Sequence, residues 1–331
     1  MNCAVIGGGS WGTAFAQILI DAGNDVVLWA RDEAVVKQVN TEHRNDRFHP
    51  GRDLPESLRA TADLPEAIRG ADLVALAIPS QAMRPMLKEM KSSISNQAIL
   101  VSLIKGVELE TMERMSQVIQ EVLECGQDQI AVATGPNLAG ELIARQPAGG
   151  VVASLNILTA EIVQHAIATS YFRPYTSNDV IGCELAGAMK NVIALAVGMS
   201  AGLGMGDNTR ATVITRGLAE MSRLGEAIGA QSATFAGLAG LGDLVATCSS
   251  PLSRNRSFGE RLGQGMELIE AVAATKTTVE GVRAAPAILA LARANHIEVP
   301  ITEAVGDVLI GDLTTADAVR RLMGRSKKAE S

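Results

Sequence analysis

Two charged residues stand alone in apolar stretches of the C-terminal half, and their chemistry suits a proton-transfer site. Lys190 is the only charged residue in 185–206, and Asp243 is the only one in 227–253. Small residues next to Lys190 let another element approach closely, and burial lowers the pKa of a lysine towards the range where it can give and take a proton. A structural lysine that reaches solvent and an aspartate that caps a helix are the alternatives.

A polar and basic cluster, Ser253-Arg254-Asn255-Arg256, stands directly before a predicted helix. Positive side chains at a helix start oppose the helix dipole, at a cost of about 0.3–1 kcal/mol each. A bound anion reverses that sign, because backbone N–H groups and guanidinium groups then face a negative charge. The cluster therefore predicts an anion site, with a basic surface turn as the alternative.

Three glycines, Gly7, Gly9 and Gly12, form a G-x-G-x-x-G pattern that follows a short apolar run and opens a helical segment. In this setting the first glycine permits a tight turn and the second lets the backbone approach a pyrophosphate. The third allows close packing of helix and strand, and the helix N-terminus faces the anion. The pattern predicts dinucleotide binding rather than an ordinary turn.

The second apolar run ends at Arg31-Asp32. An acidic residue at this place binds the ribose 2′-hydroxyl of NAD, whereas an arginine accepts the 2′-phosphate of NADP. Because both types are present and Arg31 comes first, we expect NAD(P), with NADP slightly preferred or both used. An arginine that only solvates the strand end is the alternative.

The elements that must position these residues alternate in the first half of the chain. Short apolar runs, typical of strands buried on both faces, alternate with helical segments, which predicts a parallel, doubly wound sheet of Rossmann type. Such a sheet binds ligands beyond the carboxyl ends of its strands, where Lys105, Gly135 and Asn137 lie. For Lys105 an ordinary exposed lysine is the alternative. The expected strands are 3–6, 25–29, 73–78, 98–103 and 130–133, with a helix at 10–22 after the first.

The second half has helical spacing almost to its end. Ser177-Asn178-Asp179 is expected to cap the first of its helices. The predicted fold class is therefore α/β, with an NAD(P)-binding Rossmann-like domain at 1–177 and an all-α substrate and catalytic domain at 178–331. The expected helices are 179–199, 211–227, 285–294 and 314–323.

Composition excludes several classes of protein. The chain has 331 residues, a formal net charge of −7 and only 3% aromatic residues, which argues against a nucleic-acid partner. The four cysteines are far apart and the four histidines lack ligand spacing, so we expect no disulfide framework and no metal. With no signal peptide visible and no segment suited to spanning a membrane, we expect a cytoplasmic protein. Gly- and Ala-rich helices suit a homodimer.

The chain resembles the bacterial-type NAD(P)-dependent glycerol-3-phosphate dehydrogenases. The resemblance runs almost end to end and rests on the order and spacing of blocks at 7–14, 105–106, 135–136, 190–191, 214–221, 240–244, 253–256 and 279–281. It implies an enzyme that interconverts dihydroxyacetone phosphate and sn-glycerol 3-phosphate by hydride transfer and supplies glycerophospholipid synthesis.

The resemblance also implies roles for individual residues. Lys190 is implied as the proton donor or acceptor, and Asp243 is in a place to orient Lys190 or a substrate hydroxyl. Beside the glycines of the loop, the implied cofactor contacts are Ser10, Trp11, Arg31, Lys105, Ala139, Arg254 and Glu280. The implied substrate contacts are Lys105, Gly135, Asn137, Lys190, Asp243, Ser253, Arg254 and Asn255.

Two residues depart from the pattern of the family. Asn137 stands where serine or threonine is usual, and Ile104 stands where threonine is common. An asparagine retains a hydrogen-bonding side chain, and an apolar residue at 104 need not disturb Lys105. Two other functions remain open at this point: a two-domain dehydrogenase of another hydroxy acid or sugar acid, and a non-catalytic dinucleotide-binding redox sensor. The basic cluster favours a phosphorylated substrate, and a sensor would not need isolated Lys190 and Asp243.

Overall fold

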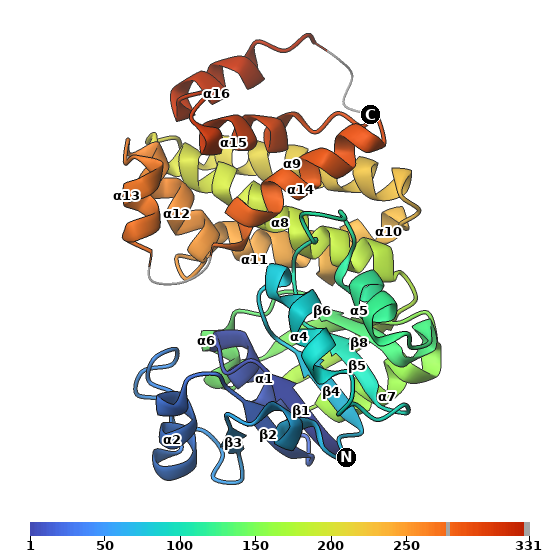
Figure 1. Ribbon diagram of the computed structural model, residues 1–331. Coiled ribbons are helices and arrows are strands. Elements are labelled where there is room, and N and C mark those ends of the chain that lie inside the picture. Colours follow the sequence, from blue (N-terminus) through green and yellow to red (C-terminus); the bar gives the residue numbers. More distant parts are fainter. Residues whose placement is uncertain (276–278, 328–331) are drawn as a thin grey trace.

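An eight-stranded sheet forms the first half of the protein, as seen in a computed structural model that describes residues 1–275 and 279–327 (Figure 1). The strand order is β3-β2-β1-β4-β5-β6-β7-β8, and neighbouring strands are parallel except for the antiparallel pair β6–β7. The strands are β1 (Asn2–Ile6), β2 (Asp25–Trp29), β3 (Arg59–Thr61), β4 (Leu73–Leu76), β5 (Ile99–Ser102), β6 (Ile130–Thr134), β7 (Ala148–Ala153) and β8 (Phe172–Ser177).

The expected Rossmann-type sheet is confirmed, and all five predicted strands are present. The prediction of an entirely parallel sheet is wrong at β7, which runs against β6. The connection between them holds only the five-residue helix α6 (Ala139–Ile143), which is too short to carry the chain back along a strand. Strands β3, β7 and β8 were not predicted from the sequence, because β3 has three residues, β7 contains two glycines and β8 contains Pro174.

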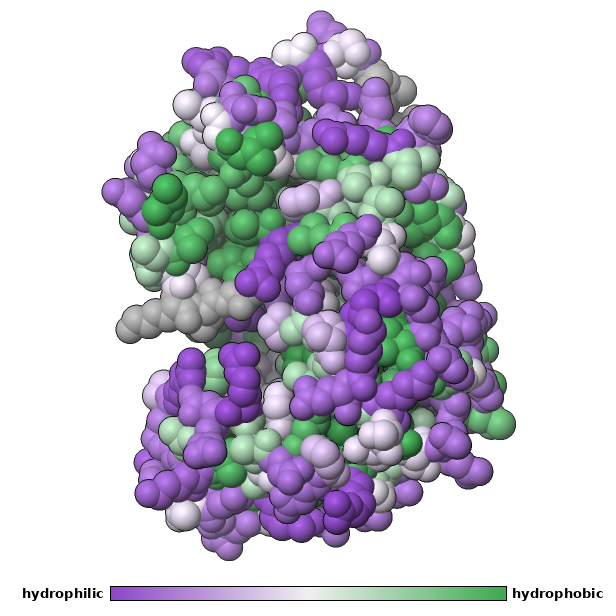
Figure 2. Space-filling view, in the orientation of Figure 1, coloured by the Kyte–Doolittle hydropathy of each residue, from purple (hydrophilic) through white to green (hydrophobic). Residues whose placement is uncertain are grey.

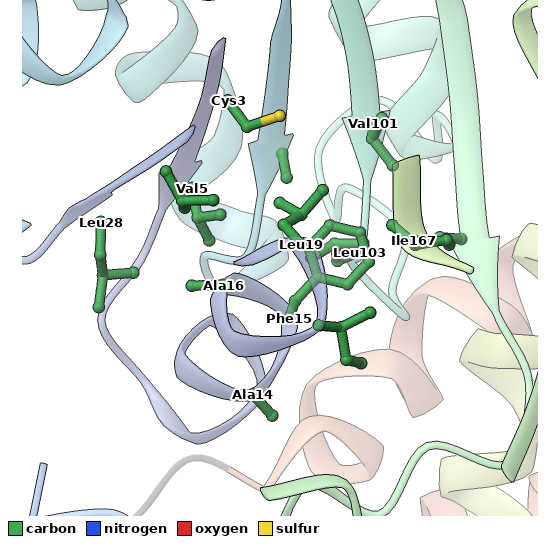
Figure 3. Packing of buried hydrophobic residues seen from close by; sticks show 14 of the residues in the cluster. Cys3, Val5, Ala14, Phe15, Ala16, Leu19, Leu28, Val101, Leu103 and Ile167 are labelled. Carbon is green, nitrogen blue, oxygen red and sulfur yellow. The ribbon is translucent and has the colours of Figure 1, made fainter. Parts of the chain in front are cut away.

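Helices cover both faces of the sheet, since its strands are buried on both sides. One face packs on α1 (Ser10–Asp21), α2 (Glu33–Glu42), α6 and α7 (Ile157–Ile167). The other packs on α3 (Leu64–Ile68), α4 (Met83–Met90) and α5 (Met115–Leu123). Figure 3 shows Phe15 and Leu19 of α1 pointing into the first of these cores, together with Val5 and Leu103.

The second half of the protein is built around α8 (Val180–Gly202), as the helical prediction requires. Asp179 caps α8 by accepting a hydrogen bond from the backbone N–H of Gly182 at 2.9 Å, which confirms the predicted cap. The helices around α8 are α9 (Asp207–Ala227), α10 (Ser232–Ala236), α11 (Asp243–Ser249), α12 (Arg254–Gly263), α13 (Leu268–Ala273), α14 (Glu280–Ala294), α15 (Pro300–Ile310) and α16 (Thr315–Met323).

In length and composition α8 has the character of a membrane-spanning helix. It has 23 residues, so this apolar stretch is longer than the sequence was expected to contain. In the most apolar part of α8, 89% of the residues are buried inside the protein, because neighbouring helices pack around it. The same features are those of a core helix, which is the position α8 has in the fold.

Glycines let α8 and α12 approach until their backbones touch. A Cβ atom at Gly198 would lie 2.0 Å from the carbonyl oxygen of Arg256, and one at Gly202 would lie 2.1 Å from that of Glu260. From the other helix, a Cβ at Gly259 would lie 2.2 Å from the carbonyl oxygen of Leu195. The glycines that suggested an interface between two copies of the chain thus serve a contact inside one copy.

We predict that Gly259→Ala destabilises the protein by about 1–3 kcal/mol, because backbone atoms must move to admit the new methyl group. Gly140 on α6 is the control, since a Cβ there has no atom within 4 Å. Gly140→Ala should stabilise by about 0.4–1 kcal/mol. Denaturant unfolding of both variants measures the difference, and an unchanged midpoint for Gly259→Ala would contradict the prediction.

Candidate active site

The carboxylate of Asp243 bridges two lysine side chains that come from opposite halves of the chain. Lys105 Nζ donates to Asp243 Oδ2 at 2.6 Å, and Lys190 Nζ donates to Oδ1 at 2.5 Å. Lys190 also donates to Thr247 Oγ1 at 2.8 Å, and Lys105 donates to the carbonyl oxygen of Gly135 at 2.9 Å. The exposed fractions are 2% for the Asp243 side chain, 8% for Lys190 and 16% for Lys105. The structure thus joins the two isolated charges to the lysine that follows β5.

Three elements bring these side chains together. Lys105 comes three residues after β5 ends, Lys190 lies in the middle of α8, and Asp243 is the first residue of α11. A short π-helical turn, Leu238–Gly242, leads into α11, and a Cβ at Gly240 would lie 2.2 Å from the carbonyl oxygen of Phe235. The alternative that Asp243 is a plain helix cap does not hold, because its two oxygens are directed at the lysines.

Burial and charge shift the proton affinities of this group in opposite directions. Burial lowers the pKa of Lys190 to about 8, against the attraction of Asp243 and with the help of the Lys105 cation. Burial alone would raise the pKa of Asp243, but the cations of Lys105 and Lys190 outweigh it and hold that pKa below its usual range. One carboxylate between two ammonium groups leaves a net positive charge, which favours an anion or a developing oxyanion beside it.

The glycine loop has the backbone geometry that its motif predicts. Gly7 has φ +128°, and a Cβ there would lie 2.4 Å from the carbonyl oxygen of Ala77. A Cβ at Gly12 would lie 1.9 Å from the carbonyl oxygen of Gly7, so the helix packs directly on the turn. At Gly9, which precedes α1, a Cβ would meet no atom within 4 Å. The loop thus leaves room at the helix N-terminus for a pyrophosphate.

Three residues beside the glycine loop define its surroundings. Trp11 has a buried indole nitrogen with no hydrogen-bond partner among the described residues, and its ring meets Phe15 edge-on at 5.8 Å. His49 Nε2 lies 2.9 Å from the carbonyl oxygen of Ser10 and 3.4 Å from Ser10 Oγ. Burial lowers the pKa of His49, which favours the neutral ring. His49 was not predicted from the sequence, since nothing local marks a histidine 39 residues away from its partner.

At the end of β2 the two candidate cofactor contacts differ in their surroundings. Asp32 caps α2 by accepting from the backbone N–H of Ala34 at 3.0 Å, and its other oxygen pairs with Arg47 at 2.5 Å. Arg31 is exposed and forms no salt bridge within the described part of the chain. The carboxylate is therefore occupied by the protein, whereas the Arg31 guanidinium faces solvent.

The basic cluster lies at the start of α12, as predicted. Ser253 is the N-cap and accepts from the backbone N–H of Arg256 at 3.3 Å, and Arg254 is the exposed first residue of the helix. The Arg254 cation acts on Glu280, the first residue of α14, where burial raises the carboxyl pKa and Arg254 opposes that rise. Glu280 Oε2 lies 3.9 Å from an ideal Cβ at Gly106, so it also borders the loop after β5.

Asn255 has a structural task that the sequence did not reveal. Its Nδ2 donates to Asn191 Oδ1 at 2.9 Å, and its Oδ1 accepts from the backbone N–H of Gly281 at 2.9 Å. Asn191 in turn donates to the carbonyl oxygen of Lys105 at 3.4 Å. The two asparagines therefore link the start of α12 to the residue that approaches Asp243.

The loop after β6 supplies the remaining predicted residues. Gly135 has φ +115°, and the half-buried Asn137 has a buried Oδ1 with no partner in the described part of the chain. Ala139 begins α6 and packs at the edge of the core around α1. Ile104, the second departure from the family pattern, is 7% exposed and packs in the core around α4 and α5.

Most of the predicted residues lie in three groups, and one of these is the basic cluster at the start of α12 together with Glu280. Lys105, Lys190, Asp243 and Gly135 share direct contacts, whereas Ser10, Trp11 and Arg31 border the glycine loop and share no hydrogen bond with that group in the described residues. Thr247 was missed, although its position four residues after Asp243 on α11 was a helical signal. Figure 2 shows the surface hollowed between the two halves, on the side where α6 and α12 lie. Within 1–275 and 279–327, no three His, Cys, Asp or Glu residues cluster as metal ligands.

Known proteins resemble this chain over nearly its whole length. Residues 2–160 match the family model of the NAD-dependent glycerol-3-phosphate dehydrogenase N-terminus, and residues 179–320 match that of the C-terminus. A glycerol-3-phosphate dehydrogenase [NAD(P)+] of Streptomyces griseus is 54% identical over 100% of this chain and 98% of its own length. The enzyme of that name from Corynebacterium diphtheriae is also 54% identical, over 100% of both chains.

A solved structure has the same fold. The crystal structure of glycerol-3-phosphate dehydrogenase from Coxiella burnetii has a TM-score of 0.93 and 37% identity, and the match covers 98% of this chain and 99% of that one. The fold, the glycine loop and the end-to-end sequence identity to these relatives all indicate the same family. The chain belongs to the family of NAD(P)-dependent glycerol-3-phosphate dehydrogenases.

Proposed function

We propose that Lys190 transfers the proton when the enzyme interconverts dihydroxyacetone phosphate and sn-glycerol 3-phosphate. NAD(P)H, when bound, supplies the hydride that reduces the carbonyl carbon of dihydroxyacetone phosphate. Protonated Lys190 gives its proton to the oxygen of that carbonyl as negative charge develops there, and neutral Lys190 takes a proton from the hydroxyl in the reverse reaction. The observation that carries this proposal is the buried bridge from Lys190 to Asp243, together with a lysine pKa near 8.

Asp243 and its neighbours have supporting roles in this mechanism. Asp243 orients Lys190 and holds the ammonium groups of Lys105 and Lys190 close together. Without the carboxylate between them, these two buried cations would repel each other. Thr247 fixes the direction of the Lys190 ammonium group from a second side. The Lys105 cation stabilises the developing alkoxide electrostatically, since its ammonium shares the same carboxylate. Lys105, Lys190 and Asp243 are proposed to contact the reacting end of the substrate, with Gly135 and Asn137 beside them.

We place the substrate phosphate at the start of α12. The helix N-terminus, the Ser253 hydroxyl and the exposed Arg254 guanidinium offer donors and positive charge to a dianion. Asn255 has its oxygen and one N–H engaged by the protein, so its remaining N–H is the one left for the phosphate. Binding energy from this remote group then aligns the carbonyl with the cofactor and with Lys190.

For the cofactor we propose the glycine loop and the residues around it. The pyrophosphate contacts the N-terminus of α1, with Gly7, Gly9 and Gly12 shaping the loop. Arg31 is in place for a 2′-phosphate, and the engagement of Asp32 by Arg47 supports a slight preference for NADP or the use of both cofactors. The other proposed contacts are Ser10, Trp11, Lys105, Ala139, Arg254 and Glu280.

The wider setting is proposed from the activity. We assign cofactor binding to residues 1–177 and substrate binding and catalysis to residues 178–331. The product is the backbone of glycerophospholipids, so the enzyme supplies their synthesis from the cytoplasm. A homodimer stays a prediction, now without the support of the α8 and α12 glycines, which meet inside one copy of the chain.

The pH dependence of the two directions tests the role of Lys190. Reduction needs the protonated amine, so kcat/KM for dihydroxyacetone phosphate should fall as pH rises through about 8. Oxidation needs the neutral amine, so kcat/KM for sn-glycerol 3-phosphate should rise through the same pH. NAD(P)H absorbance between pH 6.5 and 9.5 measures both, with each cofactor in turn. Profiles that are flat across this interval in both directions would exclude Lys190 as the proton carrier.

Removal of Arg254 tests the phosphate site. Arg254→Ala should raise the KM for dihydroxyacetone phosphate by roughly 10- to 100-fold, the loss expected for one hydrogen bond to a charged group. With NAD(P)H at saturating concentration, which offsets the loss of a cofactor contact, reduction of unphosphorylated dihydroxyacetone should be nearly unchanged, because it has no group at the phosphate site. Arg210→Ala, which removes an exposed arginine paired with Asp207 on α9, is the control and should leave both reactions as they are. An unchanged KM in Arg254→Ala would remove this residue from the site.

A further inference from the structure

A buried carboxylate outside the proposed proton path lies on the same helix as Lys190. Glu184 of α8 is 3% exposed, and its side chain faces the segment that runs from Lys105 to the start of α5. Its Oε2 accepts from Arg114 Nη1 and from Ser116 Oγ, both at 2.6 Å. Its Oε1 accepts from the backbone N–H of Ser116 at 2.8 Å. A carboxylate of the helical half thus caps the first turn of α5 in the sheet half.

The segment that Glu184 contacts, residues 105–116, is a loop whose two ends pair with each other. Arg114 pairs with Val107 in an isolated β-bridge, and the backbone N–H of Glu108 donates to the carbonyl oxygen of Glu113 at 2.9 Å. Fixing Arg114 therefore fixes Val107, which stands two residues from Lys105. Val107 is 1% exposed and packs in the core of the helical half.

One face of α8 touches this segment at helical spacing. Glu184 contacts Arg114, and an ideal Cβ at Gly187 would lie 3.2 Å from Lys105 Cγ. Asn191 donates to the carbonyl oxygen of Lys105 at 3.4 Å. Positions i, i+3 and i+7 lie on one side of a helix, so the segment runs along α8 next to Lys190. Of these three contact positions, Glu184 is the charged one.

We propose that Glu184 is a positioning residue that holds the 105–116 segment against α8, so that Lys105 and Lys190 share Asp243. This inference rests on the proposed role of the lysine pair. Without the carboxylate, Arg114 loses its buried partner and the first turn of α5 loses its cap. The segment then shifts, Lys105 moves away from Asp243, and catalysis falls because one cation is misplaced.

The experiment compares Glu184→Ala with Glu184→Gln in the full chain. Glu184→Ala should lower kcat for dihydroxyacetone phosphate by about 10- to 100-fold. Glutamine can still accept from the backbone N–H of Ser116 and donate to its hydroxyl, but it gives Arg114 no carboxylate, so Glu184→Gln should lower kcat less than Glu184→Ala does.

The pH profile separates positioning from a loss of folding. Lys190 faces Asp243 and Thr247 from α11 and Lys105 from the segment, and burial keeps the Cys248 thiol neutral by raising its pKa to about 12. The Lys105 cation lowers the pKa of Lys190, so its displacement raises that pKa. The alkaline fall of the reduction rate should therefore move to higher pH in Glu184→Ala.

Glu220 provides a matched control. It is also a buried glutamate that caps another helix, since it accepts from the backbone N–H groups of Ile301 and Thr302 at 2.6 and 3.2 Å. Glu220→Ala should lower the thermal midpoint while kcat and the alkaline limb stay unchanged, because the hydrogen bonds of Glu220 within the described residues go to Ile301 and Thr302 and not to the 105–116 segment. If Glu184→Ala behaves in the same way, the proposal is overturned.

Ser116→Ala keeps the test decisive if Glu184→Ala does not fold. It removes one hydroxyl that donates to Glu184 and leaves the backbone contact in place. We expect a kcat reduced severalfold and an alkaline limb displaced in the same direction, and unchanged values would overturn the proposal. The unaltered enzyme separates the two proposals. If the unaltered enzyme does not reduce dihydroxyacetone phosphate, the proposed function is wrong. If only Glu184→Ala has normal kinetics, the positioning role alone is wrong.

Discussion

The carboxylate of Asp243 is the contact on which the site depends. It is buried, it accepts from Lys105 and Lys190 at 2.6 and 2.5 Å, and it holds together two cations that would otherwise repel each other. Because a buried charge is stable only with partners, each half of the chain is incomplete without the other. The π-helical turn before α11 and the close backbone contacts of α8 serve this arrangement, since they fix where the carboxylate and Lys190 meet.

Much of the fold was predictable because it depends on local periodicity. Wholly apolar runs predicted β1, β2, β4, β5 and β6, and helical spacing predicted the long helices of the second half. The strands that were missed are stabilised by neighbours rather than by their own composition. Strand β7 contains Gly149 and Gly150, and a Cβ at Gly150 would lie 2.7 Å from the Phe172 ring of β8, so the neighbouring strand explains Gly150.

The candidate site was predictable in its residue types but not in its contacts. Isolation in apolar sequence marked Lys190 and Asp243, and position after a strand marked Lys105. Sequence alone does not show that one carboxylate accepts from both lysines, because the partners are 53 and 138 residues apart from it. The same holds for Asn255, whose amide is committed to Asn191 and to the backbone of Gly281.

The role of Lys190 as proton carrier is tested most directly by two measurements on Lys190→Ala. One is its turnover of dihydroxyacetone phosphate with NADPH, and the other is its binding of NADPH, followed by fluorescence. Lys190 is proposed to carry the proton and lies in α8, away from the glycine loop that is proposed to hold the cofactor. The account therefore predicts that kcat falls by at least about 100-fold, as expected for loss of a general acid, while NADPH binding persists. Turnover close to that of the original enzyme, at any pH between 7 and 9, would contradict it.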